Sequence, residues 1–301
     1  MFPAPSFPCP LFSVSSQTSP PLQNAAAKPD AVTVQTLAAS PAGPAGTGPG
    51  RKPLVTLSRI GKTYANGTVA LRDVDLSIGR AEFVSLLGPS GCGKSTVLRL
   101  IAGLGTLSSG RIEWAGGTGD ARRDIGFVFQ EPTLMPWATV ADNVWLPLKL
   151  AGVGRRAARD RIAEVLEMVH LQGFEKAYPR ELSGGMKMRV SIARALITQP
   201  SVLLMDEPFA SLDEITRSRL SNDLLELWHG KGWTVVFVTH SVFESVYLSN
   251  RIVVMAARPG RVIADLDIPA PYPRGEDFRT GVPYAELCRT VSAELRRAME
   301  G

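Results

Sequence analysis

A short glycine-rich stretch early in the chain has the composition needed to hold a phosphate group. It follows an apolar run and fits the pattern GxxxxGK followed by Ser or Thr, in which glycines let backbone N–H groups turn toward phosphate oxygens. A helix beginning at the lysine would add the positive end of its dipole. We therefore expect Lys94 to contact the β- and γ-phosphates of a nucleotide and Ser95 to bind Mg²⁺. The stretch consists of Gly88, Pro89, Ser90, Gly91, Cys92, Gly93, Lys94, Ser95 and Thr96.

A glycine-rich turn that fits the pattern by chance is the alternative interpretation of this stretch. It is disfavoured because a buried strand precedes the stretch and a helical pattern follows it. Cys92 occupies a free position of the pattern, with no His or second Cys nearby in the sequence. We interpret it as a small filling residue, not as a catalytic thiol.

Two adjacent carboxylates, Asp206 and Glu207, follow the apolar run Val202–Met205. The end of a buried strand has no use for two acids unless they meet cations or water. We expect Asp206 to hold Mg²⁺ through its water shell and Glu207 to polarise an attacking water. Both acids could instead cap the following helix, but the complete phosphate-binding pattern elsewhere in the chain favours the catalytic interpretation.

These residues need a framework of strands and helices, and the hydrophobic pattern predicts one. Alternating residues indicate half-buried antiparallel strands, whereas short continuous apolar runs are typical of a parallel sheet covered on both faces. The alternating segments are Leu54–Ile60 and Ala70–Ile78; the continuous runs are Phe83–Leu87, Ile125–Phe129, Val202–Met205 and Val235–Val238, and Ile252–Met255 with Val262–Ile268 predicts a closing hairpin. Helical patterns cover Ser95–Ala102, Arg155–Val169, Met186–Thr198, Ile215–His229 and Val242–Leu248. This alternation predicts an α/β fold.

The segment Leu182–Met186, with the sequence LSGGM, precedes an amphipathic helical pattern and lies shortly before the strand that ends in the two carboxylates. It resembles the LSGGQ signature of ABC ATPases, and the order of the motifs is the order in that family. Ser183, Gly184 and Gly185 place a hydroxyl and bare N–H groups at a helix N-terminus, where a γ-phosphate could bind. An ordinary Ser-capped helix is the alternative, but a Gly-Gly pair costs helix stability and is poorly explained by capping alone.

Other positions also resemble motifs of ABC ATPases, and the resemblance implies their roles. Gln130 is similar to the Q-loop glutamine that contacts Mg²⁺ and the attacking water. Asp213, in Ser211-Leu212-Asp213, is similar to the D-loop at the dimer interface. His240 is similar to the switch histidine that touches the γ-phosphate, and Tyr64 to the aromatic residue that stacks on adenine.

The resemblance covers about residues 54–265 and implies a P-loop NTPase fold with a RecA-like parallel-sheet core, an antiparallel β subdomain and a helical signature subdomain near 131–198. It also implies a homodimer that sandwiches ATP and Mg²⁺ and drives two transmembrane permease subunits. Three departures from the family pattern are Met186, Met188 and Ser241, none of which removes a phosphate-binding or catalytic group.

Two further segments, 131–153 and 255–262, are similar to the ATPases of bacterial nitrate, sulfonate and taurine importers. In that branch the first segment docks the permease, and exposed Pro136, Trp137 and Trp145 would suit a protein contact. The same aromatic residues could instead fill the core of the helical subdomain, and the sequence leaves both options open. The resemblance implies a peripheral location at the cytoplasmic face of the inner membrane, with a periplasmic solute-binding protein as an indirect partner.

Composition sets the remaining limits. Residues 1–52 are rich in Pro, Ala and Ser and are predicted to be a disordered extension, 53–268 the ATPase domain and 269–301 a peripheral C-terminal extension. The 301 residues carry a net charge of +5 without a clustered basic patch, so no nucleic-acid partner is expected. The 3 cysteines are too few and too scattered for a disulfide framework, and no apolar stretch is long enough for a membrane span.

Besides an import ATPase, two other functions are compatible with a phosphate-binding turn: a soluble ABC-type ATPase and a GTP-dependent switch. A soluble ABC-type ATPase acting on nucleic acid or the ribosome usually has two ABC modules or a long coiled-coil insert, and the chain shows neither. A GTP-dependent switch would need the guanine-reading NKxD motif, which is absent from the sequence.

Overall fold

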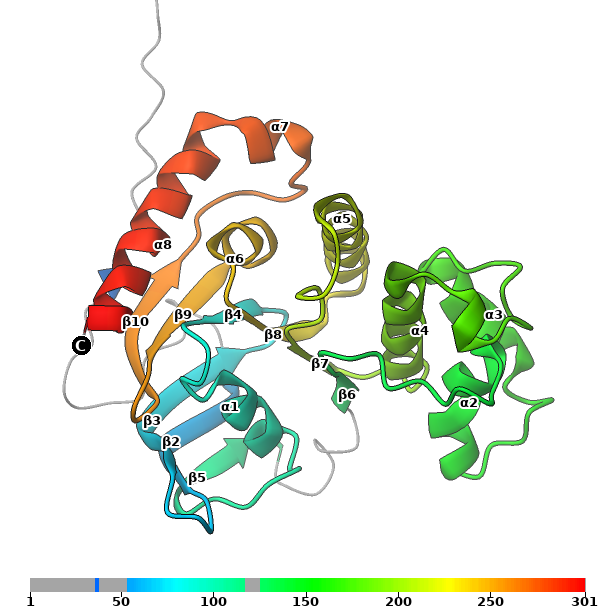
Figure 1. Cartoon of the computed structure of the whole chain (residues 1–301), viewed down its shortest axis with the longest axis horizontal. Helices are drawn as coiled ribbons and strands as arrows, with labels where there is room; N and C mark the ends of the chain where they lie inside the picture. The colour runs from blue at the N-terminus through cyan, green and yellow to red at the C-terminus, as the bar shows by residue number, and fades with distance from the viewer. Residues whose placement is uncertain (1–35, 38–52, 117–124, 301) are drawn as a thin grey trace, which may run out of the picture. The chain divides into compact units, whose positions relative to one another are not determined.

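The fold is a mostly parallel sheet joined to a smaller antiparallel sheet, with helices around them (Figure 1). The structure is a computed structural model and describes residues 36–37, 53–116 and 125–300. The larger sheet contains, in spatial order, β1 (Thr36–Leu37), β10 (Arg261–Asp267), β9 (Arg251–Ala256), β4 (Phe83–Leu87), β8 (Thr234–Thr239), β7 (Val202–Asp206) and β6 (Ile125–Val128). From β9 to β6 every neighbouring pair is parallel, whereas β10 runs antiparallel to β9 and β1 antiparallel to β10. The predicted parallel core is confirmed.

The central strands are continuous apolar runs because both faces of the sheet are covered. In β8, Val235 and Phe237 belong to one hydrophobic cluster, and Val236 and Val238 to the other. The first cluster includes side chains of the helices α2 to α6 and α8, and the second joins the sheet to α1 and the antiparallel sheet. Successive side chains of a strand point to opposite faces, so every residue of such a strand must be apolar.

The smaller sheet has the order β3 (Val69–Gly79), β2 (Pro53–Thr63) and β5 (Ser109–Trp114), with both pairings antiparallel. The two strands predicted from alternation correspond to β2 and β3. β5 was not predicted, because five of its six residues are exposed or only half-buried and show no alternation that could indicate a strand.

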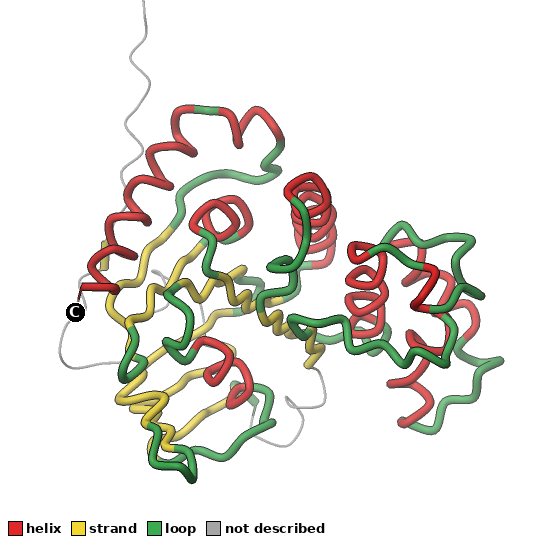
Figure 2. Tube along the Cα trace, in the orientation of Figure 1, coloured by secondary structure: helices red, strands yellow, loops and turns green. Residues whose placement is uncertain are grey.

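Helices fill both faces of the large sheet and form a group of their own beyond its β6 edge (Figure 2). Their bounds are α1 (Lys94–Ile101), α2 (Val140–Leu150), α3 (Arg159–Met168), α4 (Gly184–Leu196), α5 (Glu214–Lys231), α6 (Val242–Leu248), α7 (Glu276–Thr280) and α8 (Val282–Glu300), with a short 3-10 turn at Pro179–Glu181. The group beyond β6 consists of α2, α3 and α4 and agrees with the helical subdomain predicted near 131–198. α2 was not predicted as a helix; it contains Pro147, a residue that normally signals a helix end.

The C-terminal segment is not peripheral, contrary to the prediction. α8 packs against α6 and β9, and it buries Leu287, Cys288 and Val291 in the first hydrophobic cluster. The predicted disorder of residues 1–52 lies outside the described residues except at Thr36–Leu37, whose backbone pairs with β10. Within the described ranges, no helix is both long enough and apolar enough to cross a membrane.

Candidate functional site

Most of the predicted site residues, but not those of the signature segment or Asp213, gather where the parallel strands β4, β6, β7 and β8 end. Because parallel strands present their carboxyl ends at one edge of the sheet, residues that are far apart in sequence meet there. A cavity of about 640 Å³ lies at this edge. It is lined by Tyr64, Thr68, Val69, Ala70, Ser90, Gly91, Gly93, Lys94, Ser95, Thr96, Gln130, Glu207 and Arg258.

Glycines shape the phosphate-binding turn between β4 and α1. Gly91 and Gly93 have positive φ angles of 79° and 93°, which only glycine adopts without strain. A Cβ added to Gly88 would lie 2.5 Å from the carbonyl oxygen of Met255, so no side chain fits there. Gly93 is the N-cap of α1 and has no side-chain cap, which leaves the first N–H groups of the helix available to an anion. Cys92 is fully buried, and burial raises the pKa of its thiol, as expected for a filling residue.

Lys94 is held inside the turn, with only 4% of its surface exposed. Its Nζ donates to the carbonyl oxygens of Gly88 at 2.9 Å and Pro89 at 3.1 Å, and lies 3.5 Å from Glu207 Oε1. A buried ammonium is costly unless it is paired and hydrogen-bonded, and here it is both. The turn therefore holds a positive charge at the floor of the cavity.

Asp206 and Ser95 form the part of the site that is suited to a metal ion. Ser95 Oγ donates to Asp206 Oδ1 at 2.6 Å. Burial raises the pKa of Asp206, although the Ser95 hydroxyl and nearby positive charges act to lower it. The carboxylate and hydroxyl are hard oxygen ligands of the kind Mg²⁺ prefers, and Gln130 brings an amide oxygen to the same cavity. The residues present thus fit a magnesium ion shared with a bound phosphate.

Glu207 lies between two partners. Its Oε1 is 3.5 Å from Lys94 Nζ, and its Oε2 is 3.1 Å from Nδ1 of His240, which follows β8. Its φ of 45° lies in the left-handed region, a conformation that costs free energy for a non-glycine residue. The structure thus brings Glu207 together with a histidine 33 residues further along the chain and with a lysine that lies more than a hundred residues before it.

Tyr64 lies on the turn between β2 and β3 and lines the cavity. Its hydroxyl is hydrogen-bonded to Thr96 Oγ1 at 3.2 Å, and Lys62 Nζ lies 5.3 Å from its ring centroid. Its side chain is partly exposed and available to a planar base.

The signature segment lies at the start of α4 and not at the cavity. Ser183 is the N-cap of α4 and accepts from Met186 N at 3.3 Å. Asp213 caps α5 in the same way, accepting from Thr216 N at 3.0 Å, and this hydrogen bond lowers the pKa of its carboxyl. Neither Ser183, Gly184, Gly185 nor Asp213 lines the cavity within the described part of the chain.

Four residues that line the cavity were missed by sequence reasoning: Thr68, Val69, Ala70 and Arg258. Arg258 belongs to the turn between β9 and β10, whose Gly260 donates to the Ala70 carbonyl at 3.0 Å and fixes the turn beside β3. The Arg-Pro-Gly sequence predicted a turn, but nothing in it showed that the turn would reach the nucleotide end of the sheet.

The segment predicted to meet a permease contains one tryptophan that packs against the core and one that is exposed. Trp145 packs partly against the first hydrophobic cluster, and its Nε1 donates to the Val153 carbonyl at 3.0 Å. Trp137 is 77% exposed, and Pro136 beside it is also exposed. Trp145 therefore fills the helical subdomain, whereas Trp137 is free to contact a partner.

The phosphate-binding turn, the paired acids and the parallel sheet define a P-loop nucleotide-hydrolysing domain. The ABC transporter family pattern matches residues 71–210. The aliphatic sulfonates import ATP-binding protein SsuB of Bacillus licheniformis is 46% identical over 241 residues, which cover 78% of this chain and 91% of that protein. An uncharacterized ABC transporter ATP-binding protein of Methanocaldococcus jannaschii is 46% identical over 239 residues, covering 78% of this chain and 87% of that protein.

Solved structures agree with these relatives. A dimeric ATP-binding cassette in a post-hydrolysis state, bound to ADP and Pi, superposes with a TM-score of 0.64 at 36% identity, covering 72% of this chain and all of that one. The chain belongs to the ABC transporter family of ATP-binding proteins. It is an ATP-binding and ATP-hydrolysing protein, as the predictions of the family, the fold and the ATPase activity stated.

Proposed function

We propose that the chain is the ATPase subunit of an ABC importer, and that it hydrolyses ATP with Mg²⁺ in the cavity at the end of β4. The observation that carries the site is the convergence of Lys94, which follows β4, with Asp206 and Glu207, which stand together at the end of β7. The relatives named as sulfonate import proteins support the direction of transport and favour a sulfonate over nitrate or taurine.

In the proposed reaction, the α1 N-terminus and Lys94 bind the β- and γ-phosphates, and Tyr64 stacks on the base. Ser95, Asp206 and Gln130 would hold Mg²⁺, which would neutralise charge on the phosphate oxygens. Glu207 accepts a proton from the attacking water as the water oxygen bonds to the γ-phosphorus, the bond to the β-phosphate oxygen breaks, and ADP and phosphate leave. His240 holds the Glu207 carboxylate in place through the contact at 3.1 Å. Lys94, now engaged with phosphate, no longer competes for Glu207.

The signature residues could contact a bound nucleotide only if two molecules of the protein associate. Ser183 and the two glycines lie at the N-terminus of α4, away from the cavity of their own chain. In a head-to-tail homodimer they would close the partner's cavity by offering N–H groups to the γ-phosphate. The dimeric arrangement of the solved ATP-binding cassette supports this proposal.

The proposed membrane partners are two permease subunits, with a periplasmic solute-binding protein acting through them. The exposed Trp137 and Pro136 give the helical group a surface suited to such a contact. The chain would then work as a peripheral protein at the cytoplasmic face of the inner membrane. No nucleic-acid or ribosomal partner is proposed, since the matching family is that of ABC transporters and the relative from Bacillus licheniformis is named as an import protein.

The test of the site is the variant Glu207→Gln. We expect it to bind ATP with unchanged affinity, to lose about a hundredfold or more in kcat, and to accumulate as an ATP-bound dimer in size-exclusion chromatography. Hydrolysis at the wild-type rate would exclude Glu207 as the base. The importer proposal is tested separately, by co-purification of the tagged chain from membranes with a permease.

A further inference from the structure

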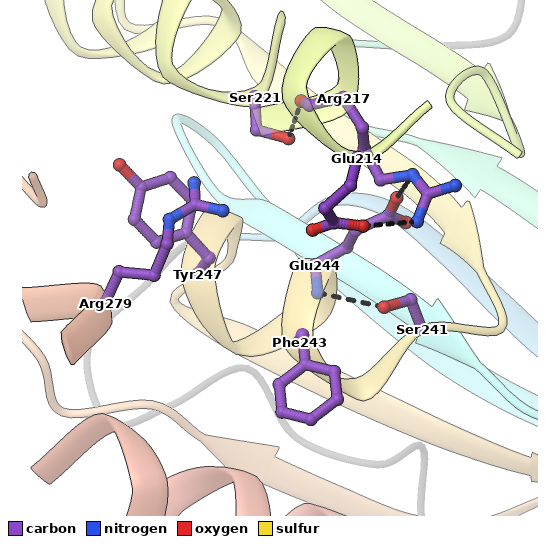
Figure 3. Close-up of a pocket in the computed structure, with 8 residues that line it drawn as sticks. All are labelled: Glu214, Arg217, Ser221, Ser241, Phe243, Glu244, Tyr247 and Arg279. Atoms are coloured by element: carbon purple, nitrogen blue, oxygen red, sulfur yellow. Dashed lines mark hydrogen bonds and ion pairs between the residues drawn. The ribbon is translucent and has the colours of Figure 1, made fainter. Parts of the chain in front are cut away.

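Beneath the nucleotide cavity, the loop that follows β7 and the turn that follows β8 are joined through α5 and α6. A small cavity of about 100 Å³ marks the junction (Figure 3). It is lined by Glu214, Arg217, Ser221, Ser241, Phe243, Glu244, Tyr247 and Arg279. Arg217 comes from the first turn of α5, and Glu244 from the first turn of α6.

Arg217 is bonded to the backbone of the loop that carries Asp213. Its Nη2 donates to the Leu212 carbonyl at 2.8 Å and its Nε to the Phe209 carbonyl at 3.3 Å. The same guanidinium lies 3.4 Å from the Glu244 carboxylate through Nε and 3.1 Å from Glu214 through Nη1. Figure 3 shows both carboxylates beside the guanidinium, each joined to it by a dashed line. The Arg217 side chain therefore holds the loop at two points, the carbonyl groups of Phe209 and Leu212.

Glu244 is bonded in the same way to the turn that carries His240. It accepts from the Thr239 hydroxyl at 2.5 Å, on the residue before the histidine. Thr239 Oγ1 in turn accepts from Ser241 N at 3.0 Å, and Ser241 Oγ accepts from Glu244 N at 3.3 Å. The backbone on both sides of His240 is thus fixed by this one carboxylate and its helix.

The ion pair between Arg217 and Glu244 is more buried than the one between Arg217 and Glu214. The Glu244 side chain is only 11% exposed, whereas Glu214, the other carboxylate on Arg217, is 79% exposed. Burial raises the pKa of Glu244, although the Thr239 hydroxyl, Arg217 and His240 act to lower it. Removing one partner of a largely buried ion pair costs more than removing one partner of an exposed pair.

We propose that Arg217 and Glu244 are positioning residues for hydrolysis, which tie the loop of Phe209 to Asp213 to the turn of His240 and so hold His240 against Glu207. The chain of contacts runs from the Leu212 carbonyl through Arg217, Glu244 and Thr239 to His240, and ends at Glu207. This inference rests on the roles proposed for Glu207 and His240. Neither Arg217 nor Glu244 touches the nucleotide cavity.

The experiment is a double-mutant cycle on the whole protein. We expect Glu244→Ala to lower kcat about tenfold and to leave the Kd for a fluorescent ATP analogue within about twofold of the wild type. In a His240→Ala background the same substitution should cost nothing further, because its effect passes through His240. Rates are measured in single turnover with excess protein, which keeps the slow variants measurable.

The control is Glu214→Ala, which removes the exposed partner of the same arginine and should leave kcat unchanged. If Glu244→Ala lowers the Tm too far to be assayed, Arg217→Met is carried through the same cycle, because it keeps the apolar stem and loses every guanidinium contact. An unchanged kcat in the single variant, or losses that multiply in the double variant, would overturn the proposal. Wild-type turnover by Glu207→Gln would instead refute the site itself, so the two failures are distinguishable.

Discussion

Asp206 and Glu207 are neighbours in the sequence, yet their surroundings give them different properties. Asp206 is 5% exposed and bonded to Ser95, and burial raises its pKa. Glu207 turns back into the cavity through a left-handed φ and meets Lys94 and His240. These different surroundings are the basis for proposing that Asp206 holds a metal ion and that Glu207 accepts a proton.

Replacing Asp206 by Asn should stabilise the nucleotide-free protein while abolishing hydrolysis. A carboxyl whose pKa is raised by folding adds stability at low pH, and that stability is lost as the pH rises through the folded pKa. The ionised, buried carboxylate is therefore a cost at neutral pH, and the amide removes it while still accepting from Ser95. We expect a higher Tm for Asp206→Asn, with a larger difference at about pH 8 than at about pH 5.

The matched control for this prediction is Asp213→Asn. The N–H of Thr216 lowers the pKa of Asp213, so its charge adds stability above the unfolded pKa and loses it as the pH falls. This variant should be slightly less stable than the wild type at about pH 8, whereas Asp206→Asn should be more stable. Equal Tm values for Asp206→Asn and the wild type across the pH range would contradict the argument.

At the scale of elements, the close approach of α4 and α5 depends on one glycine. A Cβ added to Gly185 would lie 2.5 Å from Cγ2 of Thr216, whereas at Gly184 the nearest atom, Cδ2 of Leu212, is 3.6 Å away. The first turn of α4 therefore tolerates a side chain on one side and not on the other. Of the two signature glycines, packing within the chain requires only Gly185 to lack a side chain.

Gly185→Ala should destabilise the protein by about 1–3 kcal/mol, because an extra methyl group in a packed contact forces the helices apart. Gly184→Ala meets only ordinary contact distances and should be neutral or slightly stabilising, since alanine favours a helix. Urea unfolding followed by circular dichroism measures both. Adding Thr216→Ser to Gly185→Ala removes the clashing methyl group and should restore most of the loss; failure to do so would place the strain elsewhere.

At the scale of the whole molecule, the nucleotide cavity is assembled from segments of both sheets. The β2–β3 turn brings Tyr64, the P-loop brings Lys94, and the β9–β10 turn brings Arg258. Gly260 joins the last of these to β3 by hydrogen bonds at 3.0 Å from its N–H to Ala70 and from Arg72 N to its carbonyl. The antiparallel sheet and the closing hairpin thus form one wall.

Arg258→Ala should weaken ATP binding about fivefold, the effect of removing a partly exposed charge worth about 1 kcal/mol near a polyanion. The loss should shrink at high salt, because the guanidinium faces solvent on one side. Arg72→Ala is the control: its backbone contacts the same turn, but its side chain does not line the cavity. Titration with a fluorescent ATP analogue gives both values, and equal affinity for Arg258→Ala and the wild type would contradict the prediction.

The sequence by itself determined the P-loop, the paired acids, the signature and the parallel core. These features are local: glycine adopts the positive φ angles of Gly91 and Gly93 without strain, and a strand buried on both faces is mostly apolar. The helices α5 and α6 were predicted close to their observed bounds, because a helical pattern is also a local property of the sequence. α2 and β5 were not, because a proline or a mostly exposed face hid their periodicity.

Only the tertiary structure decided which side chains meet. The pairing of Glu207 with Lys94 and His240, the entry of Arg258 into the cavity and the burial of α8 all depend on contacts between segments far apart in the chain. The same holds for Trp145 and Trp137, which the sequence could not tell apart: Trp145 packs partly against the core, whereas Trp137 is exposed. Hydrophobic periodicity fixes the face of an element, whereas the partner of that face is set by how the whole chain folds.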